Sequence, residues 1–83
     1  MLKIKADKMK DLEKFKLEYH REQRNIYEHY SYVTKGDFCN VELHLCVWCH
    51  NREIKALDRE GQDLLFDLIT SGMVEKVVED GQI

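Results

Sequence analysis

The 83-residue sequence contains no proline and only four glycines, at positions 36, 61, 72 and 81. No two glycines are adjacent, so the sequence lacks a glycine-rich phosphate loop. It also lacks long apolar runs: the run that includes residues 46–49 begins at Leu45 and ends at Cys49, far below the roughly 20 residues that cross a bilayer. Residues 1–5 lack the apolar stretch of a signal peptide. We therefore expect a cytoplasmic protein whose three cysteines are reduced thiols.

The sequence also lacks an excess of positive charge. The chain has 13 Lys and Arg against 16 Asp and Glu, a net charge of −3. Residues 1–24 carry eight basic against five acidic side chains, and residues 25–83 carry five against eleven. Direct nucleic-acid binding needs a basic surface, so this balance argues against it and leaves only a weak contact through the basic N-terminal segment as a hypothesis. At 43% hydrophobic and 35% charged residues, residues 1–83 suit one folded domain.

The first half of the chain predicts a strand, a helix and further strands. Lys3 to Lys5 alternate around Ile4 as in a short strand. Asp7 is expected to cap a helix over about 8–15, whose inner face would carry Met9, Leu12 and Phe15. From 17 to 33, tyrosines and β-branched residues favour strands, with a break near 24–25. The strand-favouring residues are Tyr19, Ile26, Tyr27, Tyr30, Tyr32 and Val33.

The clearest predicted strand follows a turn at 35–37, where Gly36 is expected to take a positive φ. Hydrophobic residues at every second position predict one buried face, with polar residues and Trp48 on the other. The predicted buried face consists of Val41, Leu43, Leu45 and Val47, and the other of Asn40, Glu42, His44 and Trp48. A turn at 50–52 and a short returning strand at 53–55 complete this part.

A second helix is predicted from about Asp58 to Ser71. Asp58 and Glu60 lie at its positive end, where the helix dipole favours acids. Gly72 is expected in the left-handed position of a Schellman stop, with Met73 packing on Leu68. The apolar stripe consists of Leu57, Leu64, Leu65, Leu68 and Ile69. Residues 73–78 fit either a last strand or one helical turn, and the tail from about 79 is expected to be mobile.

This order predicts a single α+β domain over residues 1–83. A small antiparallel sheet of four to five strands would have two helices packed on one face. The core between the sheet and the second helix would consist of Val41, Leu43, Leu45, Leu64, Leu65 and Leu68.

Two segments resemble small uncharacterised proteins encoded by phages and prophages of Gram-positive bacteria. They are residues 3–15, KIKADKMKDLEKF, and residues 67–77, DLITSGMVEKV, which together make up just under a third of the chain. The family often has glycine after the phenylalanine, where this chain has Lys16, and the middle of the chain has no counterpart. No functional residue carries over. The resemblance implies a protein that acts in the host bacterial cytoplasm, and small acidic phage proteins are often inhibitors of host defence, such as anti-CRISPR proteins.

The string from Cys46 to His50 reads C-x-x-C-H, which is also the attachment site of c-type haem. Haem attachment takes place outside the cytoplasm, so a small zinc-binding module using Cys46, Cys49 and His50 is the stronger alternative. Zinc sites usually join two ligand pairs, and here there is one. Continued strand alternation would also place Cys46 and Cys49 on opposite faces. We expect free thiols, no metal, no cofactor and no catalytic site.

Two surface features are candidates for binding a partner. Glu60, Asp63 and Asp67 recur on one face of the second helix, although such runs are more often simply solvated. Trp48 and Tyr30 lie on strands, and Trp and Tyr are common in binding hot spots, although aromatic side chains also simply cover sheets. The sequence thus favours a non-enzymatic protein that binds a host protein, such as a nucleic-acid-binding defence effector with a basic surface. Oligomeric state is left open.

Overall fold

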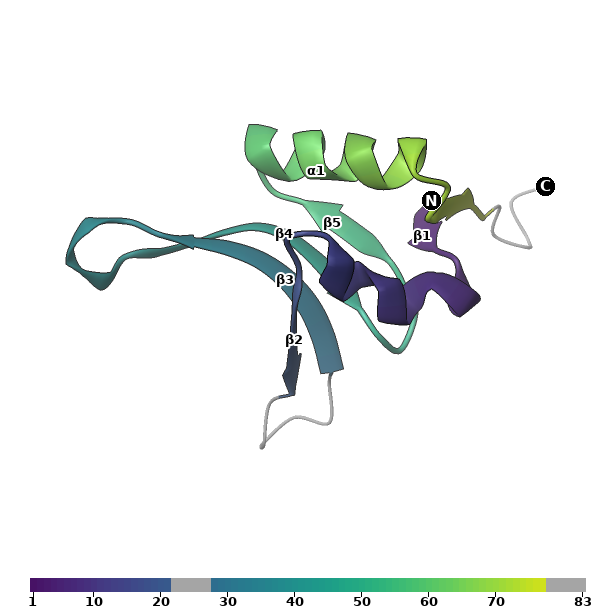
Figure 1. Ribbon diagram of the computed structural model, residues 1–83, viewed down its shortest axis with the longest axis horizontal. Coiled ribbons are helices and arrows are strands. Elements are labelled where there is room, and N and C mark those ends of the chain that lie inside the picture. The colour runs from purple at the N-terminus through teal and green to yellow at the C-terminus, as the bar shows by residue number, and fades with distance from the viewer. Residues whose placement is uncertain (22–27, 78–83) are drawn as a thin grey trace.

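The computed structural model describes residues 1–21 and 28–77, apart from the Cys39 side chain. Figure 1 shows helix α1 lying along a strongly twisted sheet. The elements in chain order are strand β1 (Leu2–Ile4), 3₁₀ helix η1 (Ala6–Lys14), strands β2 (Glu18–Arg21) and β3 (Glu28–Lys35), 3₁₀ turn η2 (Asp37–Cys39), strands β4 (Val41–Trp48) and β5 (Ile54–Ala56), helix α1 (Arg59–Thr70) and strand β6 (Val74–Lys76).

The predicted α+β class and element order are confirmed, and all strand pairing within the described residues is antiparallel. Strands β2-β3-β4-β5 form a four-stranded sheet. Of residues 73–78, whose structure the sequence left open, residue 78 lies outside the described residues, and residues 74–76 form strand β6, which pairs with β1 at the other end of the chain. A bridge between Lys3 and Glu53 joins this pair to the chain just before β5.

Helices η1 and α1 enclose one core on the same face of the sheet, because Leu12 of η1 and Leu64 and Leu68 of α1 belong to one cluster with Leu45 and Val47 of β4. The core residues are Ile4, Leu12, Leu17, Leu45, Val47, Leu64, Leu68 and Met73. Met9 and Phe15 pack against this cluster beside Leu12, as the sequence predicted. Asp7 does not cap η1: Lys5 occupies the cap position, and Asp7 lies inside the first turn.

Helix α1 ends with the predicted signal, and Asp58, predicted as an acid near the positive end of the helix, is the residue that caps it. The Asp58 carboxylate accepts a hydrogen bond from the Gly61 N–H at 2.9 Å, which satisfies one free amide of the first turn. At the other end Gly72 has φ +77°, and the Met73 N–H donates to the Leu68 carbonyl oxygen at 3.0 Å. This is the Schellman pattern. In the predicted stripe, Leu64 and Leu68 are buried and Leu65 half-buried, but Leu57 and Ile69 are largely exposed.

Strand β4 does not keep the predicted alternation. Its pairing with β3 shifts register between Tyr32 and Val33: Tyr32 pairs with Leu45, but Val33 pairs with Leu43. His44 is the extra residue of a β-bulge, which turns the next side chains to the opposite face. His44 and Leu45 are therefore both buried under α1, whereas Val41 is 59% and Leu43 40% exposed. The prediction that Val41 and Leu43 belong to the core is wrong.

Gly61 explains how closely α1 approaches the bulge. A β-carbon added at this position would lie only 1.9 Å from the His44 carbonyl oxygen. Glycine is therefore required here by close backbone contact, in a helix where it otherwise costs stability.

Beyond the bulge, β3 and β4 continue as a two-stranded hairpin, which we call the arm (residues 33–43). Within the described residues, β2 pairs only as far as Ser31 and β5 only as far as Leu45, so the arm extends beyond both neighbours and away from α1. At its tip Gly36 has φ −89°, contrary to prediction, and Phe38 takes the left-handed conformation with φ 61°. The Phe38 side chain is 97% exposed.

Some expectations fall on other parts of the chain. The predicted break near 24–25, the strand-favouring residues Ile26 and Tyr27, and the tail from 79 lie outside the described residues. In the described part of the chain, no helix is long and apolar enough to span a membrane.

Candidate functional site

The three acidic residues predicted as a stripe on α1 line one groove. Glu60, Asp63 and Asp67 follow each other at intervals of three and four residues, so they project from one side of the helix. The groove has a volume of about 180 Å³, and its other lining residues are Lys16, Tyr32 and Leu64. Its rim thus holds three carboxylates against one ammonium group.

Tyr32 and Lys16 form the wall of this acidic groove that faces α1. The Tyr32 hydroxyl donates a hydrogen bond to Glu60 Oε2 at 3.4 Å, and the Lys16 ammonium lies 5.7 Å from the centre of the Tyr32 ring. A cation over an aromatic ring is attracted by the ring's negative face. The groove therefore already holds one basic side chain over an aromatic ring, in a lining that also includes three carboxylates.

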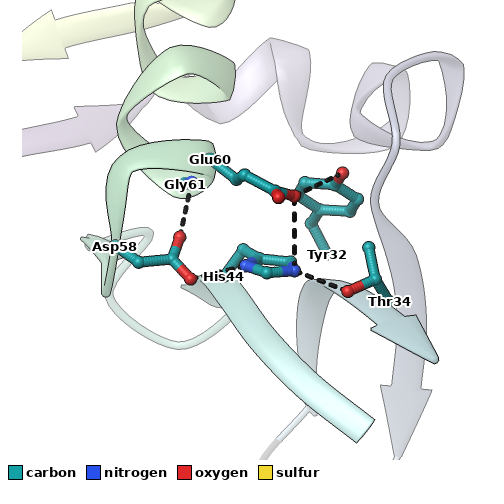
Figure 2. A network of polar contacts seen from close by, with 6 residues as sticks. All are labelled: Tyr32, Thr34, His44, Asp58, Glu60 and Gly61. Carbon is teal, nitrogen blue, oxygen red and sulfur yellow. Dashed lines mark hydrogen bonds and ion pairs between the residues drawn. The ribbon is translucent and has the colours of Figure 1, made fainter. Parts of the chain in front are cut away.

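A buried histidine network adjoins the groove (Figure 2). His44 Nδ1 lies 2.6 Å from Asp58 Oδ2, and His44 Nε2 lies 2.7 Å from Thr34 Oγ1 and 3.5 Å from Glu60 Oε2. The His44 side chain is 1% exposed, and the bulge places it here. The network joins the base of the arm, through Thr34, to the first turn of α1.

The partners of His44 determine which of its ring nitrogens carries a proton. Asp58 can only accept, so His44 Nδ1 carries a proton, and in the neutral ring Nε2 accepts from the Thr34 hydroxyl. The hydrogen bond to Asp58 raises the pKa of His44, against the opposing effect of burial, and the charges of Asp58, Glu60 and Glu42 add to the rise. The Gly61 N–H and then His44 lower the pKa of Asp58. Both shifts favour an ion pair.

The order Thr34, His44, Asp58 has the hydrogen-bond connectivity of a hydrolytic triad. Acyl transfer also requires donors aimed at a developing oxyanion beside the nucleophile. Here the Glu60 carboxylate occupies the space beside His44 Nε2, 3.5 Å away, and it would repel a negative charge. Asp58 is in addition engaged as the helix cap. We interpret the network as a clamp between the arm and α1.

The two aromatic residues predicted to bind a partner lie on different faces of the sheet. Tyr30 pairs with Val47 on the face that the helices cover, packs against the core, and contacts Tyr19 edge to face at 5.3 Å. Trp48 pairs with His29 on the face that the helices do not cover, and their ring centres are 5.5 Å apart. Neither lines the acidic groove.

The two described cysteines of the C-x-x-C string lie in different settings. Cys46 pairs with Ser31 on the uncovered face and is buried, whereas Cys49 lies in the turn after β4 and is half-buried. Both are free thiols, and burial raises the pKa of each, which disfavours the thiolate that zinc requires. Among the described residues no group of three or more His, Cys, Asp or Glu side chains is placed to hold a metal.

In comparisons with known proteins, no family model, curated protein or solved structure matches the chain.

Sequence reasoning found the acidic side chains but missed what surrounds them. The helical spacing was sufficient to place Glu60, Asp63 and Asp67 together. The partners Tyr32 and Lys16 come from distant segments, and nothing in their local sequence indicates the contact. The sequence did contain one signal for the clamp. An aspartate at the start of a helix can cap it with one carboxylate oxygen, and the other oxygen can accept a further hydrogen bond.

Proposed function

We propose that this protein is a non-enzymatic protein-binding module that blocks a host defence protein by docking its acidic groove onto a basic surface. The observation that carries the proposal is the convergence of Glu60, Asp63 and Asp67 on one groove, beside an aromatic ring that already holds a lysine ammonium. A partner's lysine or arginine would meet the same chemistry there. Direct binding of nucleic acid has no part in this proposal.

The partner we propose is a defence effector whose basic surface holds nucleic acid. Complementary charge steers such an encounter and selects the partner. Arginine is the best fit, because its planar group can bond a carboxylate through two N–H donors while stacking on Tyr32. A protein seated on that surface would exclude nucleic acid by occupying its cation sites. The resemblance to phage-encoded proteins supports this choice of partner class.

The test uses a purified nucleic-acid-guided effector of a Gram-positive bacterium and measures whether the protein displaces its labelled nucleic acid. We expect displacement that weakens as salt increases, because exposed charges are screened. Asp63→Lys with Asp67→Lys should reduce the association rate at least about tenfold, as charge mainly governs association.

The matched control is Asp7→Lys with Glu13→Lys, which makes the same change in net charge. Both side chains are exposed, and neither lines the groove. The control should bind within about twofold of the unmodified protein. Equal loss in the two double variants would reduce the proposal to net charge alone, and no displacement from any such effector would refute the choice of partner.

A further inference from the structure

The face of the sheet opposite the helices carries a hollow with an apolar part that is exposed to solvent. Along the arm it carries Val33, Leu43 and Val41, and towards the body it carries His20 and His29. A hollow of about 400 Å³ lies across this face, lined by these five residues together with Arg21 and Ser31. Leu43 and Val41 are 40% and 59% exposed, so the apolar part of the hollow faces solvent.

The arm also carries a single large apolar side chain that contacts little of its own chain. Phe38 is 97% exposed at the tip, in the left-handed conformation that bulky residues rarely adopt. Aromatic residues, phenylalanine among them, are enriched at the buried cores of protein interfaces. The arm therefore carries the exposed Phe38 ring at its tip and an apolar hollow at its base.

We propose that two copies of this chain form a symmetric dimer through their arms, with Phe38 of each copy in the hollow of the other. A two-fold axis near Val33 and Leu43 would make the two arms antiparallel, face to face. Asp37, next to Phe38, is four residues from Val33 in one direction, and His29 is four residues away in the other. Each lies about 13 Å from Val33 at the rise of an extended strand, so the tip of one arm reaches His29 of the other copy.

Charge complementarity supports this pairing. With Val33 near the axis, Lys35 of one copy is opposite Ser31 of the other, and Ser31 pairs with Glu18 on the same face. Asp37 is opposite His29, which pairs with His20, and Arg21, the next residue of β2, also lines the hollow beside its ion pair with Glu28. Lys35 would thus meet Glu18, and Asp37 would enter the end of the hollow that His20, His29 and Arg21 line, each twice because the interface is isologous. The acidic grooves of both copies stay outside the interface, on the helix-covered faces.

Sedimentation equilibrium over micromolar concentrations tests the dimer. We expect a mass twice the 9.9 kDa of the chain. Phe38→Asp should weaken the dimer on the order of a hundredfold, because each dimer loses two anchors. Phe66→Asp is the matched control, since Phe66 is 65% exposed but lies on α1, and it should leave the dimer unchanged.

A charge swap tests the geometry independently. Glu18→Lys alone and Lys35→Glu alone should each weaken the dimer about tenfold, and the two together should restore it. Far-UV circular dichroism checks that each variant folds, and both positions are exposed. A monomer at every concentration would overturn the proposal, as would a dimer that responds to Phe66→Asp and not to Phe38→Asp. Failure of the double variant to recover would also overturn the antiparallel arrangement. A monomer that binds single-stranded oligonucleotide would assign the open face to nucleic acid instead.

Discussion

The two halves of β4 have the same sequence pattern and different environments. Val41 and Leu43 lie in the first half and are 59% and 40% exposed, whereas Leu45 and Val47 in the second half are fully buried. The alternation of apolar residues continues through all four. The difference arises at His44, where one extra residue in β4 reverses which side of the strand faces α1. A regular pattern therefore does not ensure a continuous face.

The largest effect is expected from removing side chains on the two sides of the bulge. Leu45→Ala should lower the free energy of unfolding by about 2–5 kcal/mol through lost burial and a cavity, and Leu68→Ala should do the same. Leu43→Ala should cost less than about 1 kcal/mol, because its side chain is partly exposed already. Urea unfolding measures all three. Equal losses of unfolding free energy at positions 43 and 45 would place both side chains in the core and would contradict the difference between the two halves of β4.

The contact between α1 and the bulge gives the next largest effect. Gly61→Ala should destabilise the protein by about 1–3 kcal/mol, since the added β-carbon would overlap the His44 carbonyl oxygen. Gly36→Ala is the matched control, because its φ is −89° and the nearest atom to an added β-carbon is 3.7 Å away. That change should be nearly neutral in thermal unfolding. Tolerance of alanine at position 61 would show that α1 lies further from the bulge.

The prediction of the fold from sequence succeeded where the signal is local. The acidic start of α1 and its glycine stop depend on residues within one helical turn, so Asp58, Gly72 and Met73 were sufficient to place the two ends of the helix. The bulge depends instead on how β4 pairs with β3, and one strand's sequence does not contain its register. Phe38 was missed for a related reason, because the predicted positive φ was assigned to the glycine two residues earlier.

The clamp predicts a dependence of stability on pH. The folded pKa of His44 is raised above 6.5, so its stabilisation is complete below pH 6.5 and is lost as pH rises through the folded value. The folded pKa of Asp58 is lowered below 3.8, so its stabilisation is present above pH 3.8 and is lost as pH falls through the folded value. The alkaline loss should be absent in His44→Gln and retained in His20→Gln. Unfolding midpoints from pH 3 to pH 9 decide this, and an alkaline loss that persists in His44→Gln would assign it to another group.

The smallest effect is expected at the tip of the arm. Phe38→Gly should stabilise the monomer by up to about 1 kcal/mol, because glycine adopts the left-handed conformation without strain. Phe38→Ala is the control, since it keeps the strain while removing the ring. Guanidinium unfolding at low protein concentration separates the two, and equal stability of the glycine and alanine variants would show that position 38 is unstrained.

The account depends most on the change of face at His44, which methyl-resolved nuclear Overhauser spectroscopy tests directly. The prediction is that Leu45 and Val47 methyl groups show contacts to core methyl groups such as those of Leu68, while Leu43 shows contacts to Val33 and none to α1. Contacts between the methyl groups of Leu43 and Leu68 would contradict the account, because they would require an unbroken alternation along β4 and a His44 side chain on the open face.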